Sequence, residues 1–100
     1  MLDIKPYEEQ IKKICIELQL KRLDLFGSAT TENFGSNSDV DIIVEFKKDV
    51  DLNRFDSYFL LKTHLQNIFH RPIDIIIDGT IKNPYLKENI SQTRKNIYAS

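Results

Sequence analysis

The stretch that decides the fold is "LFGSATTENFGSNSDVDIIVEF", residues 25–46. It places a Gly-Ser pair at Gly27 and Ser28, and two aspartates, Asp39 and Asp41, directly before a run of β-branched residues. Burying unpaired charge costs a large amount of free energy. The aspartates therefore predict a strand whose first residues are open to water or face a cation.

Two strands are predicted on either side of the Gly-Ser pair. The stretch "RLDLF", residues 22–26, alternates polar and apolar residues and stops at Gly27, which indicates a short strand entering a tight turn. Residues 29–38 are small and polar and leave room for a short helical turn and a loop. The stretch "DVDIIVEF", residues 39–46, has a continuous apolar centre, which favours a central strand covered on both faces.

Helices are predicted before, between and after the strands. Apolar residues recur at helical spacing through "PYEEQIKKICIELQLK", residues 6–21, with Pro6 in the first turn. A second helix is expected from an N-cap at Asp51 to about His70, followed by a third strand over residues 73–77. Asn83-Pro84 opens the last predicted helix, whose inner face is expected to carry Leu86, Ile90 and Ile97. The residues expected in the core from the two earlier helices are Cys15, Phe55, Phe59 and Phe69.

This order of elements predicts a small α/β (α+β) fold, a mixed sheet with helices packed on it, formed by residues 1–100 as one domain. Fourteen Lys and Arg against fifteen Asp and Glu give a formal net charge of -1, without a basic block, so direct nucleic-acid binding is not expected. With one cysteine, no membrane-length apolar stretch and no signal-peptide core, we expect a cytoplasmic protein without a membrane partner.

The chemistry is expected where the strands begin. Asp39 and Asp41 alternate onto the same face of a strand, roughly 6.6 to 7 Å apart along it, and Mg²⁺ takes one or two such carboxylates and completes its shell with water and phosphate. Gly27 permits close backbone approach, and the Ser28 hydroxyl and the following N–H groups suit a phosphate. Asp74 lies second in the "IDIII" strand, where a third carboxylate could bind a second metal or accept a proton from an attacking hydroxyl.

These residues carry a family resemblance. Gly27-Ser28, ten intervening residues, then Asp39-Val40-Asp41, with Asp74 later, resembles the signature of the DNA polymerase β-like nucleotidyltransferases. At this length the chain looks like a minimal nucleotidyltransferase, the antitoxin of a HEPN–MNT toxin–antitoxin pair. The resemblance implies the polymerase β-like fold, ATP as substrate, two Mg²⁺ ions and transfer of AMP to a tyrosine of a cognate HEPN ribonuclease toxin, with which it could form a hetero-oligomer.

One departure from the family keeps an alternative open. Many relatives carry an Arg-Gly step shortly after Gly-Ser, whereas "ATTENFG", residues 29–35, contains no arginine; Arg54 or Arg71 could supply a cation instead. The alternative is a non-catalytic antitoxin that neutralises its toxin by stoichiometric binding. Transfer to a small molecule is disfavoured, because so short a chain cannot easily build an acceptor pocket.

The other polar residues are not expected to take part in the chemistry. Asp24 lies on a strand and is expected to be exposed, and Asp78 is expected to be a turn residue. Glu45 shares the face of Asp41 but lies beyond the site, and His64 and His70 are expected at the surface or the helix end without a metal role.

Overall fold

The computed structural model describes residues 2–31, 35, 38–47 and 54–100, with Arg54 and Phe55 described by their backbone alone. In chain order the elements are η1 (Lys5–Tyr7), α1 (Glu8–Glu17), β1 (Leu20–Phe26), η2 (Gly27–Thr30), β2 (Val40–Phe46), α2 (Arg54–Phe69), β3 (Ile73–Ile77), α3 (Pro84–Thr93) and β4 (Lys95–Ala99). The predicted N-cap Asp51 lies outside the described residues.

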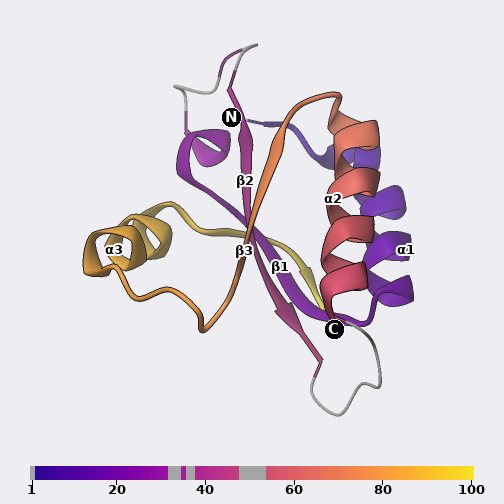
Figure 1. The fold of residues 1–100 in the computed structure, drawn as a ribbon. Helices are drawn as coiled ribbons and strands as arrows, with labels where there is room; N and C mark the ends of the chain where they lie inside the picture. Colours follow the sequence, from indigo (N-terminus) through magenta and orange to yellow (C-terminus); the bar gives the residue numbers. More distant parts are fainter. Residues whose placement is uncertain (1, 32–34, 36–37, 48–53) are drawn as a thin grey trace.

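The four strands form one mixed sheet in the order β3-β2-β1-β4 (Figure 1). β2 and β3 are parallel, while β1 is antiparallel to both β2 and β4. The predicted central position of β2 is confirmed, since it lies between β3 and β1 and its residues Ile42, Ile43 and Val44 are all buried.

The helices cover the two faces of the sheet unequally. α1 and α2 lie together on one face and α3 lies on the other (Figure 1). The larger core, between the sheet and α1 and α2, includes Ile11, Cys15, Leu23, Leu25, Ile42, Val44, Leu61 and Leu65. A smaller apolar cluster of Phe26, Ile43 and Ile90 holds α3 to the opposite face. In the described part of the chain, no helix has the length and apolarity needed to cross a membrane.

The first helix is shorter than predicted. α1 ends at Glu17, and Gln19 takes a positive φ of 57°, which turns the chain into β1 at Leu20. Leu20 is fully buried and lies opposite Phe46 of β2. Pairing of this apolar residue in the sheet therefore overrides the helical spacing that extended the prediction to residue 21.

The last predicted helix also ends early, and a strand replaces its second half. Asn83 caps α3 as predicted, its side chain accepting from the backbone N–H groups of Tyr85 and Leu86. The expectation that Ile97 lies on this helix is wrong, because Ile97 belongs to β4. β4 pairs with the edge of β1, and this long-range pairing is invisible to local periodicity.

Two expectations about burial are also corrected. Phe59 is 50% exposed, because α2 turns Leu61, Leu65 and Phe69 toward the sheet instead. Asp24, expected at the surface, is fully buried on β1.

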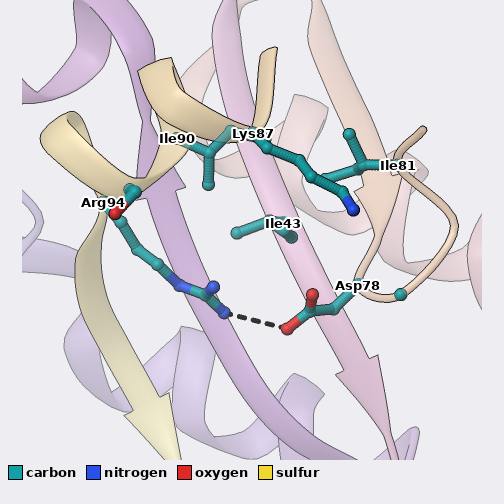
Figure 2. A pocket seen from close by; sticks show the side chains of 8 residues that line it. Ile43, Asp78, Ile81, Lys87, Ile90 and Arg94 are labelled. Carbon is teal, nitrogen blue, oxygen red and sulfur yellow. Dashed lines mark hydrogen bonds and ion pairs between the residues drawn. The ribbon is translucent and has the colours of Figure 1, made fainter. Parts of the chain in front are cut away.

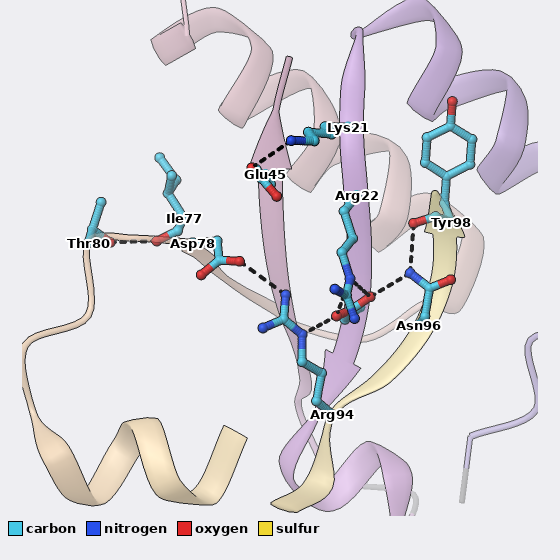
Figure 3. Close-up of polar contacts among 10 residues, drawn as sticks. Lys21, Arg22, Glu45, Ile77, Asp78, Thr80, Arg94, Asn96 and Tyr98 are labelled. Atoms are coloured by element: carbon cyan, nitrogen blue, oxygen red, sulfur yellow. Dashed lines mark hydrogen bonds and ion pairs between the residues drawn. The ribbon is translucent and has the colours of Figure 1, made fainter. Parts of the chain in front are cut away.

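Asp24 is the centre of a polar network with Arg22, Arg94 and Asn96. Figure 3 shows these three side chains pointing toward one another. Its carboxylate forms ion pairs with Arg94 and Arg22 and accepts a hydrogen bond of 2.8 Å from Asn96, and Arg94 also reaches Asp78 at 3.1 Å. Burial alone would raise the pKa of Asp24, but the hydrogen bonds from Arg94, Arg22 and Asn96 outweigh it and hold that pKa below its ordinary value.

We expect Asp24→Asn to lower the free energy of unfolding by roughly 3 kcal/mol at pH 7, since it removes one partner of a buried ion pair. Asp56→Asn on exposed α2 surface is the matched control and should change it by less than about 0.5 kcal/mol. Urea unfolding measures both, and equal effects would contradict a stabilising role for the network.

The same pair of variants gives a pH dependence. The lowered pKa means that the contribution of Asp24 is fully present above the unfolded value of about 4 and is lost as the pH falls through the folded value. The stability difference between the wild type and Asp24→Asn should therefore shrink in acid, whereas a difference independent of pH would show that the charge of Asp24 contributes nothing.

Candidate functional site

Three aspartates gather where β2 and β3 begin. In the parallel register Asp41 lies beside Asp74, and across the antiparallel pair it lies beside Phe26, the last residue of β1. Asp39 precedes β2 by one residue. Asp39 and Asp74 are exposed and Asp41 is partly buried, so this end of the sheet is open to water. The predicted pairing of the Asp74 strand beside that of Asp41 is confirmed.

The surroundings of Asp41 in this cluster disfavour its ionised form. Burial, followed by the negative charges of Asp74 and Asp39, raises the pKa of Asp41 above its ordinary value. Carboxylates held together in this way are typical of sites that bind a cation.

The chemistry of the donors fits magnesium bound together with a phosphate. In the described ranges, no three His, Cys, Asp or Glu side chains are drawn closely enough together to hold a metal by themselves. Mg²⁺ needs only one or two carboxylates from the protein when waters and phosphate oxygens supply the rest of its shell. Asp39, Asp41 and Asp74 are the residues that would contribute those oxygens.

Gly27 is required by its contact with the cluster. Its φ is +67°, and a Cβ atom built on it would lie 2.8 Å from Oδ2 of Asp41. Any side chain at this position would therefore displace the Asp41 carboxylate or the turn itself. The glycine lets the backbone of the Gly-Ser turn approach the carboxylate directly.

The turn after Gly27 is fixed by hydrogen bonds from both directions. The Gly27 N–H donates to the Thr93 hydroxyl at 2.8 Å, and the Gly27 carbonyl accepts from the Thr30 hydroxyl at 2.9 Å. The Ser28 carbonyl accepts from Thr31, whereas the Ser28 hydroxyl makes no hydrogen bond within the described part of the chain. The Gly27 N–H is therefore already used within the fold, and phosphate binding by the Ser28 hydroxyl stays a prediction.

Thr93 is a positioning residue that the sequence interpretation missed. It lies in the last turn of α3, where its hydroxyl donates to the carbonyl of Asn89 at 2.7 Å while accepting from Gly27. Sixty-six positions separate Thr93 from Gly27, so no local pattern could have linked them. Through this contact α3 holds the Gly-Ser turn.

Arg71 supports the approach to the cluster. Its guanidinium donates to the backbone carbonyl of Ser38 at 3.1 Å and to that of Gly35, which holds the chain just before Asp39. The sequence raised Arg71 and Arg54 as sources of a cation for a triphosphate. Arg71 contacts backbone here, and the Arg54 side chain lies outside the described residues.

A mixed sheet with carboxylates at the start of two parallel strands, next to a Gly-Ser turn, is the arrangement of a nucleotidyl-transfer enzyme. Residues 9–100 match the family described as polymerase beta, nucleotidyltransferase, and the chain belongs to this family. It is similar to two Methanocaldococcus jannaschii proteins, "Putative protein adenylyltransferase MJ0128" and MJ1379 of the same description, at 35% and 33% identity over 91 residues, covering 90% of each chain.

Solved structures share the fold. A structure described as "putative minimal nucleotidyltransferase" matches with a TM-score of 0.72 and 21% identity, covering 92% of this chain and 90% of that one. A toxin–antitoxin structure with AMP-PNP matches with a TM-score of 0.70 and 21% identity over 94% of this chain and 74% of that one. The structure of a tri-AMPylated Shewanella oneidensis HEPN toxin in complex with MNT antitoxin matches with a TM-score of 0.61 and 19% identity. The match covers 93% of this chain and 70% of that one. The expected polymerase β-like fold is confirmed.

Comparing two glycines tests the close approach in the site. Gly27 and Gly79 both have positive φ, but a Cβ at Gly79 would meet nothing within 4 Å. We expect Gly79→Ala to cost about 1 kcal/mol from backbone strain alone, and Gly27→Ala to cost roughly 2–3 kcal/mol because it also meets Asp41. Thermal and urea unfolding measure both, and equal costs would show that the Asp41 contact is unimportant.

The raised pKa of Asp41 yields a stability prediction of opposite sign to that of Asp24. Because the folded pKa is raised, ionising Asp41 as the pH rises above about 4 costs folding free energy. Asp41→Asn should therefore keep or raise the free energy of unfolding, by about 1 kcal/mol at pH 7 with a chelator present. Urea unfolding beside the Asp56→Asn control measures this, and a clear loss of stability would contradict a destabilising charge at Asp41, whether from its burial or from the neighbouring carboxylates.

Proposed function

We propose that this protein transfers AMP from ATP to a hydroxyl of another protein in a Mg²⁺-dependent reaction, and that the acceptor is a tyrosine of a cognate HEPN toxin. The observation that carries the proposal is the approach of Gly27 to the Asp41 carboxylate, with Asp74 in register beside it. This arrangement supports the proposal, because phosphates bound at the Gly-Ser turn would lie directly against the oxygens that would hold the metal.

Each residue has a separate role in the proposed reaction. Asp39 and Asp41 would hold the metal, whose positive charge would neutralise the phosphates and the departing pyrophosphate. Ser28 binds the phosphates with its hydroxyl, and Gly27 brings the turn close. The acceptor oxygen forms a bond to the α-phosphorus as the bond from that phosphorus to the β-phosphate oxygen breaks, and Asp74 takes the acceptor proton.

The relatives support protein as the acceptor. Curated proteins similar over nearly their whole length carry the description protein adenylyltransferase. Structures with the same fold contain a toxin–antitoxin pair, one with AMP-PNP and one with an AMPylated HEPN toxin. These findings favour ATP, a protein acceptor and a HEPN partner.

The test incubates the protein with ATP, Mg²⁺ and a HEPN toxin, which the proposal expects to be encoded beside this chain, and measures AMP transfer by intact-mass spectrometry of the toxin. The wild type should add mass in units of AMP, and an Asp39→Asn, Asp41→Asn double variant should lose at least about 100-fold in rate because the metal ligands are gone. Glu45→Gln is the matched control, since Glu45 lies farther along the same strand and pairs with Lys21; its rate should be unchanged.

The alternative, a non-catalytic antitoxin, predicts another outcome of the same experiment. If no AMP is added while wild type and double variant both form a stable complex with the toxin and silence it, neutralisation works by stoichiometric binding. Tandem mass spectrometry of any modified toxin identifies the acceptor, and a modified residue other than tyrosine would correct that part of the proposal.

A further inference from the structure

An arginine lies at each end of β3. Just past the last residue of the strand, Asp78 pairs with Arg94 at 3.1 Å beside a pocket that α3 helps to line (Figure 2). Before the first residue of the strand, Arg71 donates from a single guanidinium nitrogen to the backbone carbonyls of Gly35 and Ser38. The first arginine neutralises a carboxylate, whereas the second holds the main chain that leads into the aspartate cluster.

The parallel connection explains why Arg71 reaches this place. β2 and β3 are parallel and are joined through α2, so β3 begins at the same end of the sheet as β2. α2 ends at Phe69, and His70 takes a positive φ of 54° while its N–H donates to the carbonyl of Gln66 at 2.8 Å. This left-handed residue ends the helix and directs the chain into Arg71 and Pro72.

Arg71 and Pro72 hold both peptide groups that flank Asp39. The carbonyl of Ser38, in the peptide group before Asp39, accepts from the Arg71 guanidinium at 3.1 Å. The N–H of Val40, in the peptide group after Asp39, donates to the carbonyl of Pro72 at 3.0 Å. Two consecutive residues that lead into β3 therefore restrain the backbone of Asp39 from both sides.

Asp39 depends on this restraint more than the other aspartates do. The register of the parallel strands fixes Asp41 beside Asp74. Asp39 precedes β2, outside that register, and it is exposed, so neither strand pairing nor burial fixes it. Its position is set by the two peptide groups on either side of it.

We propose that Arg71 is a positioning residue for metal binding that acts through Asp39; the inference rests on the proposed role of Asp39 in holding the metal. By fixing the peptide group between Ser38 and Asp39, Arg71 limits the places that the Asp39 carboxylate can reach. A carboxylate held in advance loses less conformational freedom when the metal binds. The charge of Arg71 has the opposite effect, because a positive charge near the site repels a cation.

The hydrogen bonds of Arg71 also disfavour phosphate binding by the same nitrogen. A terminal guanidinium nitrogen carries two hydrogens, and the carbonyls of Gly35 and Ser38 take both of those on Nη1. Gly35 and Ser38 are bound to each other as well, since the Ser38 N–H donates to the Gly35 carbonyl at 3.1 Å and the Gly35 N–H donates to the Ser38 hydroxyl at 3.0 Å. A phosphate on Nη1 would have to displace these carbonyls.

The test titrates Mn²⁺ into the full chain without nucleotide and follows the broadening of the backbone amide signals of the aspartate cluster by NMR. Arg71→Met removes the hydrogen bonds and one positive charge. Lys13→Met, on the exposed surface of α1, removes only a charge and is the matched control. We expect Arg71→Met to weaken Mn²⁺ binding about tenfold and Lys13→Met to change it by less than about twofold.

A double-mutant cycle shows whether Arg71 acts through Asp39. Asp39→Asn removes the carboxylate, so adding Arg71→Met to it should weaken Mn²⁺ binding no further than about twofold. Equal weakening by Arg71→Met with and without Asp39 would overturn the inference, because the effect would then come from the fold as a whole. Arg71→Lys keeps the charge but lacks the planar fork, and it carries the same cycle if Arg71→Met does not fold.

The remaining outcomes separate the inference from the proposed function. Mn²⁺ binding that is unchanged or tighter in Arg71→Met overturns the inference, and the proposed function stands where wild-type binding depends on Asp41. Weaker binding of tripolyphosphate with unchanged binding of Mn²⁺ assigns Arg71 to the phosphates instead. A wild type in which neither Mn²⁺ nor its tripolyphosphate complex broadens the signals of the cluster overturns the proposed function and this inference together.

Discussion

The site depends on one close approach, that of the Gly27 backbone to the Asp41 carboxylate. A Cβ at Gly27 would lie 2.8 Å from Oδ2 of Asp41, so the space between turn and strand is already filled by the carboxylate. This contact requires β1 and β2 to be adjacent and antiparallel, with the end of one beside the start of the other. The sheet therefore positions the site by its order of strands.

Helix α3 secures this arrangement through two consecutive residues. The Thr93 hydroxyl accepts a hydrogen bond from the Gly27 N–H, and Arg94 forms ion pairs with buried Asp24 and with Asp78. The extended backbone of Arg94 ends the helix and starts the chain toward β4. One short segment thus fixes the Gly-Ser turn, neutralises a buried charge and directs the last strand onto the edge of β1.

The elements that could be predicted are those specified by neighbouring residues. β2 has a continuous apolar run, and Asn83-Pro84 is a local helix start. β4 could not be predicted, because its strand character comes from pairing with β1. The burial of Asp24 was missed for the same reason, since its partner Arg94 lies 70 residues away.

Asp24 and Asp41 lie on the same face of adjacent strands, yet the structure treats their charges oppositely. Asp24 is enclosed and receives two arginines and an amide, which lower its pKa; Asp41 receives two further carboxylates, which together with burial raise its pKa. The first arrangement stabilises the fold by itself, whereas the second is favourable only when a cation joins it. One face of the sheet therefore carries both kinds of aspartate. The charge of Asp24 is neutralised by its partners and anchors α3, whereas the charge of Asp41 is not neutralised, and a metal-bound nucleotide would stabilise it. That difference in environment, which the residue type does not reveal, separates the structural aspartate from the one proposed to hold a metal.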